Sequence, residues 1–433
     1  MSGLWMIVIF LVLLFFHVPI MISIGVSSVA YCLFLTNTPM DMIANVYFTS
    51  LDSFPLIAIP FFILAGDLMM QGGISSRLIK FFRVSLASFA GSLGAVTVVA
   101  SAVFAAVAGS GTATVACIGG ITIPEMIKEK YDKGFACALA AVAGGLGPII
   151  PPSVAMILYG VICQVSITKL FIGGIVPGLL ITIGLVALVH YVAKRDGYGV
   201  ENIDVTNVEN AEKLTVWDAF KDAIWAFMVP VIILGGIYSG LFTPTEAAVV
   251  ACVFAMFAGL FIYKEYEIKD IPAIMKKTVL TAGTIMLLVS CATALGRLLT
   301  LERVPVQIAE FLIGISDNKY IILLIINLFL LVVGMFMETY AAIIILAPVL
   351  LPTILALGVD PLHFGLIMVV NLTIGLCTPP VGVNLFIAAR IGNVPMERMF
   401  KYLIPTLSVM LIVLMLITYV PALVTTLPNL LVK

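Results

Sequence analysis

Long apolar runs separated by short polar stretches follow one another along the whole chain. A helix needs about 20 apolar residues to cross a hydrocarbon core of about 30 Å. Runs of this kind recur throughout, beginning with MSGLWMIVIFLVLLFF. They are too continuous for the alternating pattern of a transmembrane barrel. The pattern therefore predicts an all-α polytopic membrane protein.

Composition excludes a water-soluble domain. Hydrophobic residues make up 62% of the 433 residues and charged residues 10%, whereas a soluble domain has about 25% charged residues. The seven cysteines lie in apolar segments without the spacing of metal ligands. We therefore expect them to be packing residues rather than disulfides or metal ligands.

The few charges predict an orientation. Basic clusters occur at 77–83, 128–133 and 264–277, and the positive-inside rule places them in the cytoplasm. Stretches 36–52 and 240–246 contain neither Lys nor Arg and are therefore expected outside. The resulting trace has a cytoplasmic N-terminus. It leaves five of the 22 basic residues outside: Lys169, Arg297, Arg303, Lys319 and Lys433.

The two halves of the chain repeat at an offset of 228 residues. The segment GGLGPIIPPS matches IGLCTPPVG, so that Gly147 corresponds to Gly375 and Pro151-Pro152 to Pro379-Pro380. In the charge-based trace the halves enter the membrane from opposite sides, which predicts inverted repeats. The predicted organisation is as follows: a first repeat over 1–195, with scaffold helices 1–83 and a hairpin and broken helix 84–193; a cytoplasmic linker and connecting helix over 196–240; and a second repeat over 241–433, with scaffold helices 241–316 and a hairpin and broken helix 317–430.

Proline pairs inside apolar segments predict broken transmembrane helices. Proline removes a backbone donor and restricts the residue before it, so each Pro-Pro segment should be two half-helices joined by an unwound stretch. Lipid cannot satisfy the carbonyls freed there, but Na⁺ can, and half-helix N-termini favour an anion. Opposite the breaks, GSGTAT and METYAA are predicted to be the tips of two re-entrant helical hairpins.

Other interpretations stay open at this point. A small-residue motif is often only a packing surface. AGSGT superficially resembles a serine nucleophile, but no histidine lies in a recognisable catalytic motif, so we expect no enzyme. An ion or solute channel is compatible with broken helices, as is a sodium/anion symporter that works without a binding protein.

Several charged residues lie at membrane depth. Asp67 and Arg297 follow matching glycines in the two halves and are interpreted as an ion pair, as two charges lining a cleft, or as interfacial anchors. Arg390 ends a half-helix, where an anchor is the default and a substrate contact the alternative. Glu338 and Glu246 are either functional carboxylates or groups that reach water near a helix end.

The segments AGSGTATVACIGGITIPEM, GLGPIIPPSVAMILYG, METYAAIIILAPVLLP and LHFGLIMVVNLTIGLCTPPVGVNLF together resemble the large membrane subunit of the tripartite ATP-independent periplasmic (TRAP) transporters. The resemblance implies an elevator-type transporter in a bacterial inner membrane that imports an organic acid with Na⁺. It also implies two partners, a periplasmic substrate-binding protein and a small four-helix membrane subunit, the latter expected as a separate chain.

The resemblance also assigns roles to individual residues. One sodium site is expected between the first tip (Ser110, Gly111, Thr112) and the first break (Gly145, Gly147, Ile150), and another between the second tip (Met337, Glu338, Thr339) and the second break (Gly375, Thr378). Substrate contacts are expected from Ser153, Asn384, Pro151 and Pro380. The first tip reads SGTATVAC and lacks the aspartates associated with dicarboxylate members, which weakens a C4-dicarboxylate assignment. Overall similarity to the sialic acid branch makes sialic acid the favoured substrate, with a C4-dicarboxylate next.

Overall fold

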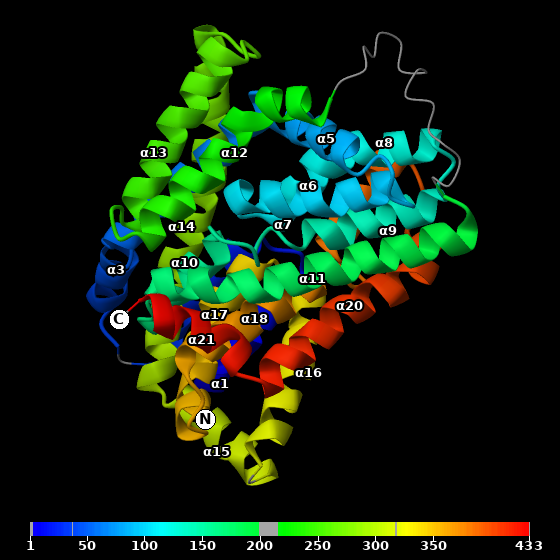
Figure 1. The fold of residues 1–433 in the computed structure, drawn as a ribbon. Helices are drawn as coiled ribbons and strands as arrows, with labels where there is room; N and C mark the ends of the chain where they lie inside the picture. Colours follow the sequence, from blue (N-terminus) through cyan, green and yellow to red (C-terminus); the bar gives the residue numbers. More distant parts are fainter. Residues whose placement is uncertain (1–2, 37, 199–214, 317, 433) are drawn as a thin grey trace.

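The computed structural model describes residues 3–36, 38–198, 215–316 and 318–432, and every regular element in these ranges is a helix (Figure 1). Among the described residues, eight helices are long and apolar enough to cross a membrane, and shorter apolar helices accompany them. The prediction of an all-helical polytopic membrane protein is therefore confirmed.

The first part of the chain forms the helices α1 (Gly3–Phe15), α2 (Ile20–Phe34), α3 (Met40–Thr49), η1 (Phe54–Ile57), α4 (Ala58–Gln71), α5 (Ile74–Ser85), α6 (Ser92–Ala108), α7 (Gly111–Thr114), η2 (Val115–Gly119), α8 (Gly120–Lys128), α9 (Lys133–Gly144), α10 (Val154–Cys163) and α11 (Ile167–Asp196). The remainder forms α12 (Val216–Tyr238), α13 (Pro244–Phe257), η4 (Ala258–Ile262), η5 (Ile268–Asp270), α14 (Ile271–Leu301), α15 (Val304–Ile315), α16 (Lys319–Phe336), α17 (Thr339–Ala356), α18 (Pro361–Leu376), α19 (Val383–Gly392), η6 (Met396–Met399), α20 (Phe400–Tyr419) and α21 (Ala422–Leu431).

The helices pack as two groups. In the first, α4 packs on α13, α5 on α12, and α14 on α2, α3 and α4. In the second, α16 packs on α18, α17 on α10, α19 on α9, and α11 on α6 and α20. Figure 1 shows the upright helices α12 to α14 beside the transverse α9, α11 and α20. The groups touch where α4 and α5 meet α6 and where α14 and α15 meet α17.

The second group contains one order of helices twice. The series α6, α7 to α8, α9, α10 and α11 corresponds to α16, α17, α18, α19 and α20, with chain interruptions after the first and third members. The 228-residue spacing carries Gly111 onto Thr339 and Lys133 onto Pro361, which begin corresponding helices. The predicted connecting helix is present as α12. Most of the predicted cytoplasmic linker falls on 199–214, outside the described residues.

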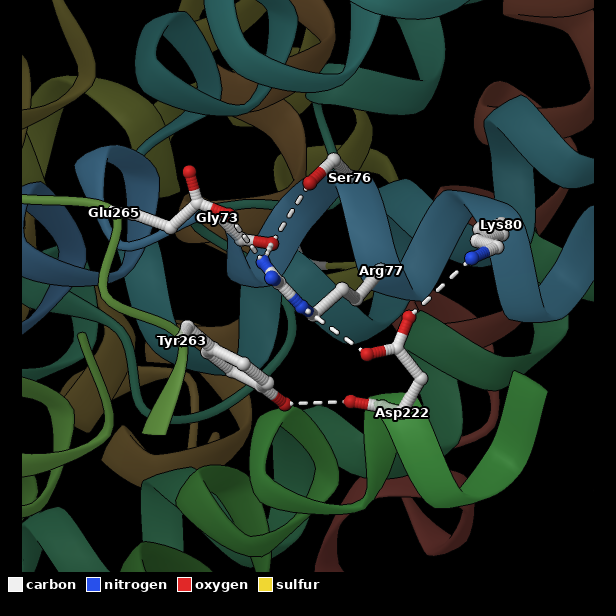
Figure 2. Close-up of polar contacts among 7 residues, drawn as sticks. All are labelled: Gly73, Ser76, Arg77, Lys80, Asp222, Tyr263 and Glu265. Atoms are coloured by element: carbon white, nitrogen blue, oxygen red, sulfur yellow. Dashed lines mark hydrogen bonds and ion pairs between the residues drawn. The ribbon is translucent and has the colours of Figure 1, made fainter. Parts of the chain in front are cut away.

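A polar cluster joins three segments of the first group (Figure 2). The Arg77 guanidinium on α5 donates to the Glu265 carboxylate at 2.8 Å and to the Gly73 carbonyl at 3.0 Å, and it lies 3.8 Å above the Tyr263 ring. The Tyr263 hydroxyl in turn donates to the Asp222 carbonyl of α12 at 2.8 Å. The Arg77 Nε also lies 3.4 Å from the Asp222 carboxylate of α12. Because the flat guanidinium both stacks and donates in several directions, it ties α5 and α12 to the segment after η4.

We expect Arg77→Lys to destabilise the protein by about 1–2 kcal/mol, because a lysine cannot keep the stacking and the forked donors together. The measurement is the denaturant midpoint in detergent. Lys80→Gln is the control, since Lys80 is half-exposed and reaches Asp222 only at 3.6 Å, an exposed pairing of little energetic value. Equal midpoints for wild type and Arg77→Lys would contradict the role assigned to Arg77.

Candidate functional site between two helix tips and two helix breaks

The first tip is the reversal between α6 and α7. Gly109 follows α6 with φ of 58°, in the left-handed region that favours glycine. Ser110 then caps α7, because its Oγ accepts from the Ala113 amide at 3.5 Å and lies 3.1 Å from the Thr112 hydroxyl. Two hydroxyl groups are therefore held together at the point where the chain turns.

The first break lies directly against this tip. Helix α9 ends at Gly144, α10 begins at Val154, and the Ser153 side chain caps α10 by accepting from the Met156 amide at 3.3 Å. A Cβ at Gly147 would overlap the backbone of Ser110, and one at Gly109 would lie 3.0 Å from the Pro152 carbonyl oxygen. Only glycine lets the two backbones approach so closely.

The second tip and break repeat this arrangement. Helix α16 ends at Phe336, α17 begins at Thr339, and the Gly382 amide before α19 donates to the Met335 carbonyl at 3.4 Å. A Cβ at Gly375, near the end of α18, would overlap the backbone of Gly334. The Gly147 and Gly375 pair found in the sequence therefore marks the two places where a broken helix is in backbone contact with a hairpin arm.

Two contacts connect the halves of the site. The buried Tyr340, next to the second tip, donates its hydroxyl to the Gly109 carbonyl of the first tip at 3.3 Å. Asn384, on the second broken helix, lies beside Gly111 and donates from Nδ2 to the Ala141 carbonyl at 3.2 Å. Residues that lie more than 200 positions apart thus form one continuous polar centre.

Two buried oxygens in this centre have no hydrogen-bond partner among the described residues: Thr339 Oγ1 and Asn384 Oδ1. Thr339 is 1% exposed and Asn384 is fully buried. Leaving a buried polar atom unpaired costs about 1–3 kcal/mol, so such atoms call for a ligand or a functional reason. Both lie at a tip or break, where a cation that accepts oxygen ligands would satisfy them.

A cleft of about 620 Å³ separates the tips from the first helix group. One wall is formed by α4 and α14. The opposite wall contains the first tip, with Ser110 and Thr112, and the second tip, with Glu338 and Tyr340. Polar groups of both tips therefore face a space that a small solute could enter.

The structure brings some of the predicted site residues together and not others. Ser110, Gly111 and Gly147 meet at the first tip, as the resemblance implied. Gly145 instead faces Cys377 and Met410, and Ile150 packs on Gly178.

The remaining predicted residues take different positions. At the second break Thr378 Oγ1 donates to the Ile374 carbonyl at 2.7 Å. The predicted substrate residue Ser153 already uses its hydroxyl on the Pro148 carbonyl and the Met156 amide. Of the two prolines, Pro151 is buried and Pro380 is exposed.

Of the three interpretations of Asp67 and Arg297, the ion pair between them is wrong. Asp67 accepts from Lys277 Nζ at 2.6 Å and from the Thr278 hydroxyl at 3.0 Å, both on α14, because α4 packs against the first half of that helix. Arg297 lies five turns further on and is exposed. The interpretation as two cleft-lining charges holds for Asp67 alone, because Arg297 is not among the residues that line the cleft.

The other membrane-depth charges have local explanations. Glu246 forms a capping box with Thr243 at the start of α13. Of the two interpretations of this carboxylate, the structure therefore has the one that places it near a helix end. Arg390 is exposed in the last turn of α19.

Sequence reasoning missed Tyr340 and Lys277 as site residues. The available signal for Tyr340 was the 228-residue offset, which places it opposite Thr112.

The fold and site define a multi-pass helical membrane protein with a polar centre built on interrupted helices. A crystal structure of the YdaH transporter from Alcanivorax borkumensis has a similar fold, with a TM-score of 0.53 at 15% identity over 84% of this chain and 86% of that one.

Sequence comparison identifies the family. The family described as the DctM component of the tripartite ATP-independent periplasmic transporter matches residues 7–423. The chain is 45% identical to the isethionate TRAP transporter permease protein DctMQ of Oleidesulfovibrio alaskensis, over 94% of this chain and 63% of that protein. It is 36% identical to the sialic acid TRAP transporter large permease protein SiaM of Vibrio cholerae, over 96% of both. The chain therefore belongs to the DctM family of TRAP transporter permeases and is a transporter component, not an enzyme.

We expect Gly375→Ala to destabilise the protein by about 1–3 kcal/mol, because the added methyl group would overlap the Gly334 backbone. A backbone cannot relieve this overlap by changing rotamer, as a side chain could. Gly283→Ala is the matched control, because a Cβ there meets nothing within 4 Å on the exposed face of α14; it should be neutral or stabilising by up to about 1 kcal/mol. The denaturant midpoint in detergent measures both. Equal effects of the two substitutions would show that α16 and α18 are not in tight backbone contact.

Proposed function

We propose that the chain is the large permease subunit of a Na⁺-coupled importer of a small organic acid. The observation that carries the proposal is the paired arrangement of two tips on two breaks, with the buried Thr339 Oγ1 and Asn384 Oδ1 left without a hydrogen-bond partner in the described part of the chain. A transporter needs such partly unsatisfied groups, because a group that is already fully paired gains little from binding a ligand.

Sodium is the cation that this proposal assigns to the tips. Na⁺ takes oxygen ligands, and the first tip offers the hydroxyls of Ser110 and Thr112 beside the carbonyls of the first break. The second tip offers Thr339 and the Glu338 carboxylate beside the second break. Glycine contacts hold tip and break together, so an ion between them would be coordinated by both and would fix their relative position.

The organic acid is proposed to bind in the cleft that both tips line. The N-termini of α10 and α19 lie behind the first tip, where Val154 is close to Gly109 and Asn384 is close to Gly111. Their freed backbone amides and helix dipoles favour a carboxylate or sulfonate. The Glu338 carboxylate lines the same cleft and disfavours an anion while it is unneutralised. Sodium at the second tip would offset that charge. Binding of the acid would thereby depend on Na⁺ through ordinary electrostatics.

Movement is proposed to follow the elevator scheme. The group α6–α11 with α16–α21 would be the transport domain and would consist of inverted repeats, and the group around α4 and α12–α14 would be the scaffold. A loaded transport domain exposes fewer unpaired polar groups than an empty one, so it slides past the scaffold more readily. Coupling is then a shift of population that is limited by how differently Na⁺ binds the two facing states.

The proposal includes the setting and the partners. We place the chain in a bacterial inner membrane with a cytoplasmic N-terminus, next to a small membrane subunit and a periplasmic binding protein that delivers the acid. Among candidate substrates, the 45% identity to an isethionate permease favours a small sulfonate. Sialic acid, which was predicted from the sequence, and C4-dicarboxylates are the other candidate substrates, and the uptake assay described next tests all three.

The test is uptake of labelled isethionate, sialic acid and succinate into vesicles that contain this chain, its small subunit and its binding protein. We expect accumulation of one acid that requires both an inward Na⁺ gradient and the binding protein. Accumulation without the binding protein would indicate a simpler symporter. Flux that only dissipates a gradient would indicate a channel, and either result would overturn the proposal.

Thr339→Val should raise the Na⁺ concentration needed for half-maximal uptake about tenfold, because the valine keeps the shape of the side chain and loses one oxygen ligand. Thr353→Val is the control. Thr353 lies in the same helix α17, and its Oγ1 is also buried without a hydrogen-bond partner among the described residues, but it lies far from the tip. Uptake by Thr339→Val with an unchanged Na⁺ requirement would remove Thr339 from the sodium site.

A further inference from the structure

Lys277 occupies a fixed position on the scaffold wall of the cleft. Its Nζ donates to Asp67 Oδ1 at 2.6 Å, and the neighbouring Thr278 donates to Asp67 Oδ2 at 3.0 Å. The Asp67 side chain is 8% exposed, whereas that of Lys277 is 55% exposed. A buried carboxylate held by two donors on one helix therefore anchors a lysine whose outer face is open to the cleft.

The Lys277 ammonium group has N–H donors that Asp67 does not use. A lysine carries three N–H donors, and one of them is directed at Asp67. Opposite it, the cleft is lined by the two tips, with the hydroxyls of Ser110 and Thr112 on one tip and Glu338 on the other. The cation therefore faces the place where the proposed substrate and Na⁺ bind.

Lys277 also begins a polar stripe on α14. Thr281 and Thr284 follow at helical spacing and line the same cleft, between the apolar Leu280 and Ile285. The two threonine hydroxyls donate to carbonyls of their own helix, those of Lys277 and Leu280. Each hydroxyl oxygen can still accept a hydrogen bond, so this wall offers a cation at one end and hydrogen-bonding groups along its length.

We propose that Lys277 binds the acid group of the substrate from the scaffold side and so determines the preference for anions. The inference rests on the proposed function, because it assumes an organic acid in this cleft. Asp67 is the positioning residue: it holds the ammonium in place and offsets part of its charge. A partly offset cation attracts a carboxylate or sulfonate without retaining it strongly, which suits release from the cleft.

The rival interpretation is structural. Lys277 would then serve only to neutralise the buried Asp67 carboxylate, which is costly to leave unpaired. The two interpretations differ for the double variant Asp67→Asn/Lys277→Gln, which removes both charges. If Lys277 only neutralises Asp67, the double variant should recover wild-type affinity. If Lys277 binds substrate, the double variant should stay as defective as Lys277→Gln.

The experiment is counterflow in proteoliposomes with labelled isethionate, and with sialic acid and succinate in parallel. The readout is the internal concentration of unlabelled acid that gives half-maximal counterflow. We expect Lys277→Gln and the double variant to raise this concentration about tenfold or more, the size of one lost charge-assisted hydrogen bond. Lys277→Arg should change it less than about threefold, since the charge is kept. Lys276→Gln is the matched control, because Lys276 is an exposed neighbour outside the cleft.

Three results would overturn the inference: wild-type affinity in Lys277→Gln, recovery in the double variant, or a defect that disappears in vesicles of neutral phosphatidylcholine, which would assign Lys277 to an anionic lipid headgroup. If Lys277→Gln fails to fold, the half-saturating concentrations of the double variant and of Lys277→Arg are compared instead. A tenfold higher value in the double variant supports the inference, and equal values overturn it. A wild type without Na⁺-dependent uptake would instead contradict the proposed function, so the two failures are distinguishable.

Discussion

A backbone that leaves the helical conformation inside a membrane must find partners for its amides and carbonyls within the protein. Within the described residues this chain does so at the tips after Ala108 and Phe336 and at the breaks after Gly144 and Leu376. In the first half the tip packs on the break, and in the second half the last turns of α16 pack on the end of α18 and on the break that follows it. The glycines at 147, 334 and 375 make this possible, because any larger residue would separate the backbones.

The same constraint explains why some polar atoms of the site are left without a hydrogen-bond partner. Packing satisfies most of the freed backbone groups, and Ser110 and Ser153 cap the helices that restart. Thr339 and Asn384 keep one oxygen each unpaired among the described residues. The first helix group meets this assembly partly through small residues, with Gly66 of α4 against Ala108 and Gly296 of α14 against Pro348. Under the proposed elevator scheme, small residues at these points would ease the movement of one group past the other.

The fold was predictable where local chemistry dictates it. The Pro-Pro pairs and their 228-residue spacing predicted both breaks, and GSGTAT and METYAA predicted both reversals. Contacts across the halves were not predictable. Asn384 against Gly111 and Lys277 against Asp67 depend on how helices more than 200 residues apart pack. The glycine match suggested Arg297 for Asp67, but sequence position within a repeat does not determine which helix face a neighbour covers. Ser153 was assigned to substrate, although a serine before a helix restart is first of all a cap.

In the proposed elevator scheme one helix group moves as a unit against the other. This movement would change the distance between spin labels on Leu355 of α17 and Leu241 of the first helix group, which pulsed electron resonance measures in lipid. The seven native cysteines are buried and free of disulfides, so introduced cysteines can be labelled selectively. We predict a second distance population that Na⁺ and substrate shift, while a scaffold pair at Thr49 and Leu241 stays constant. A single unchanged distance for Leu355 and Leu241 in every condition would contradict the account.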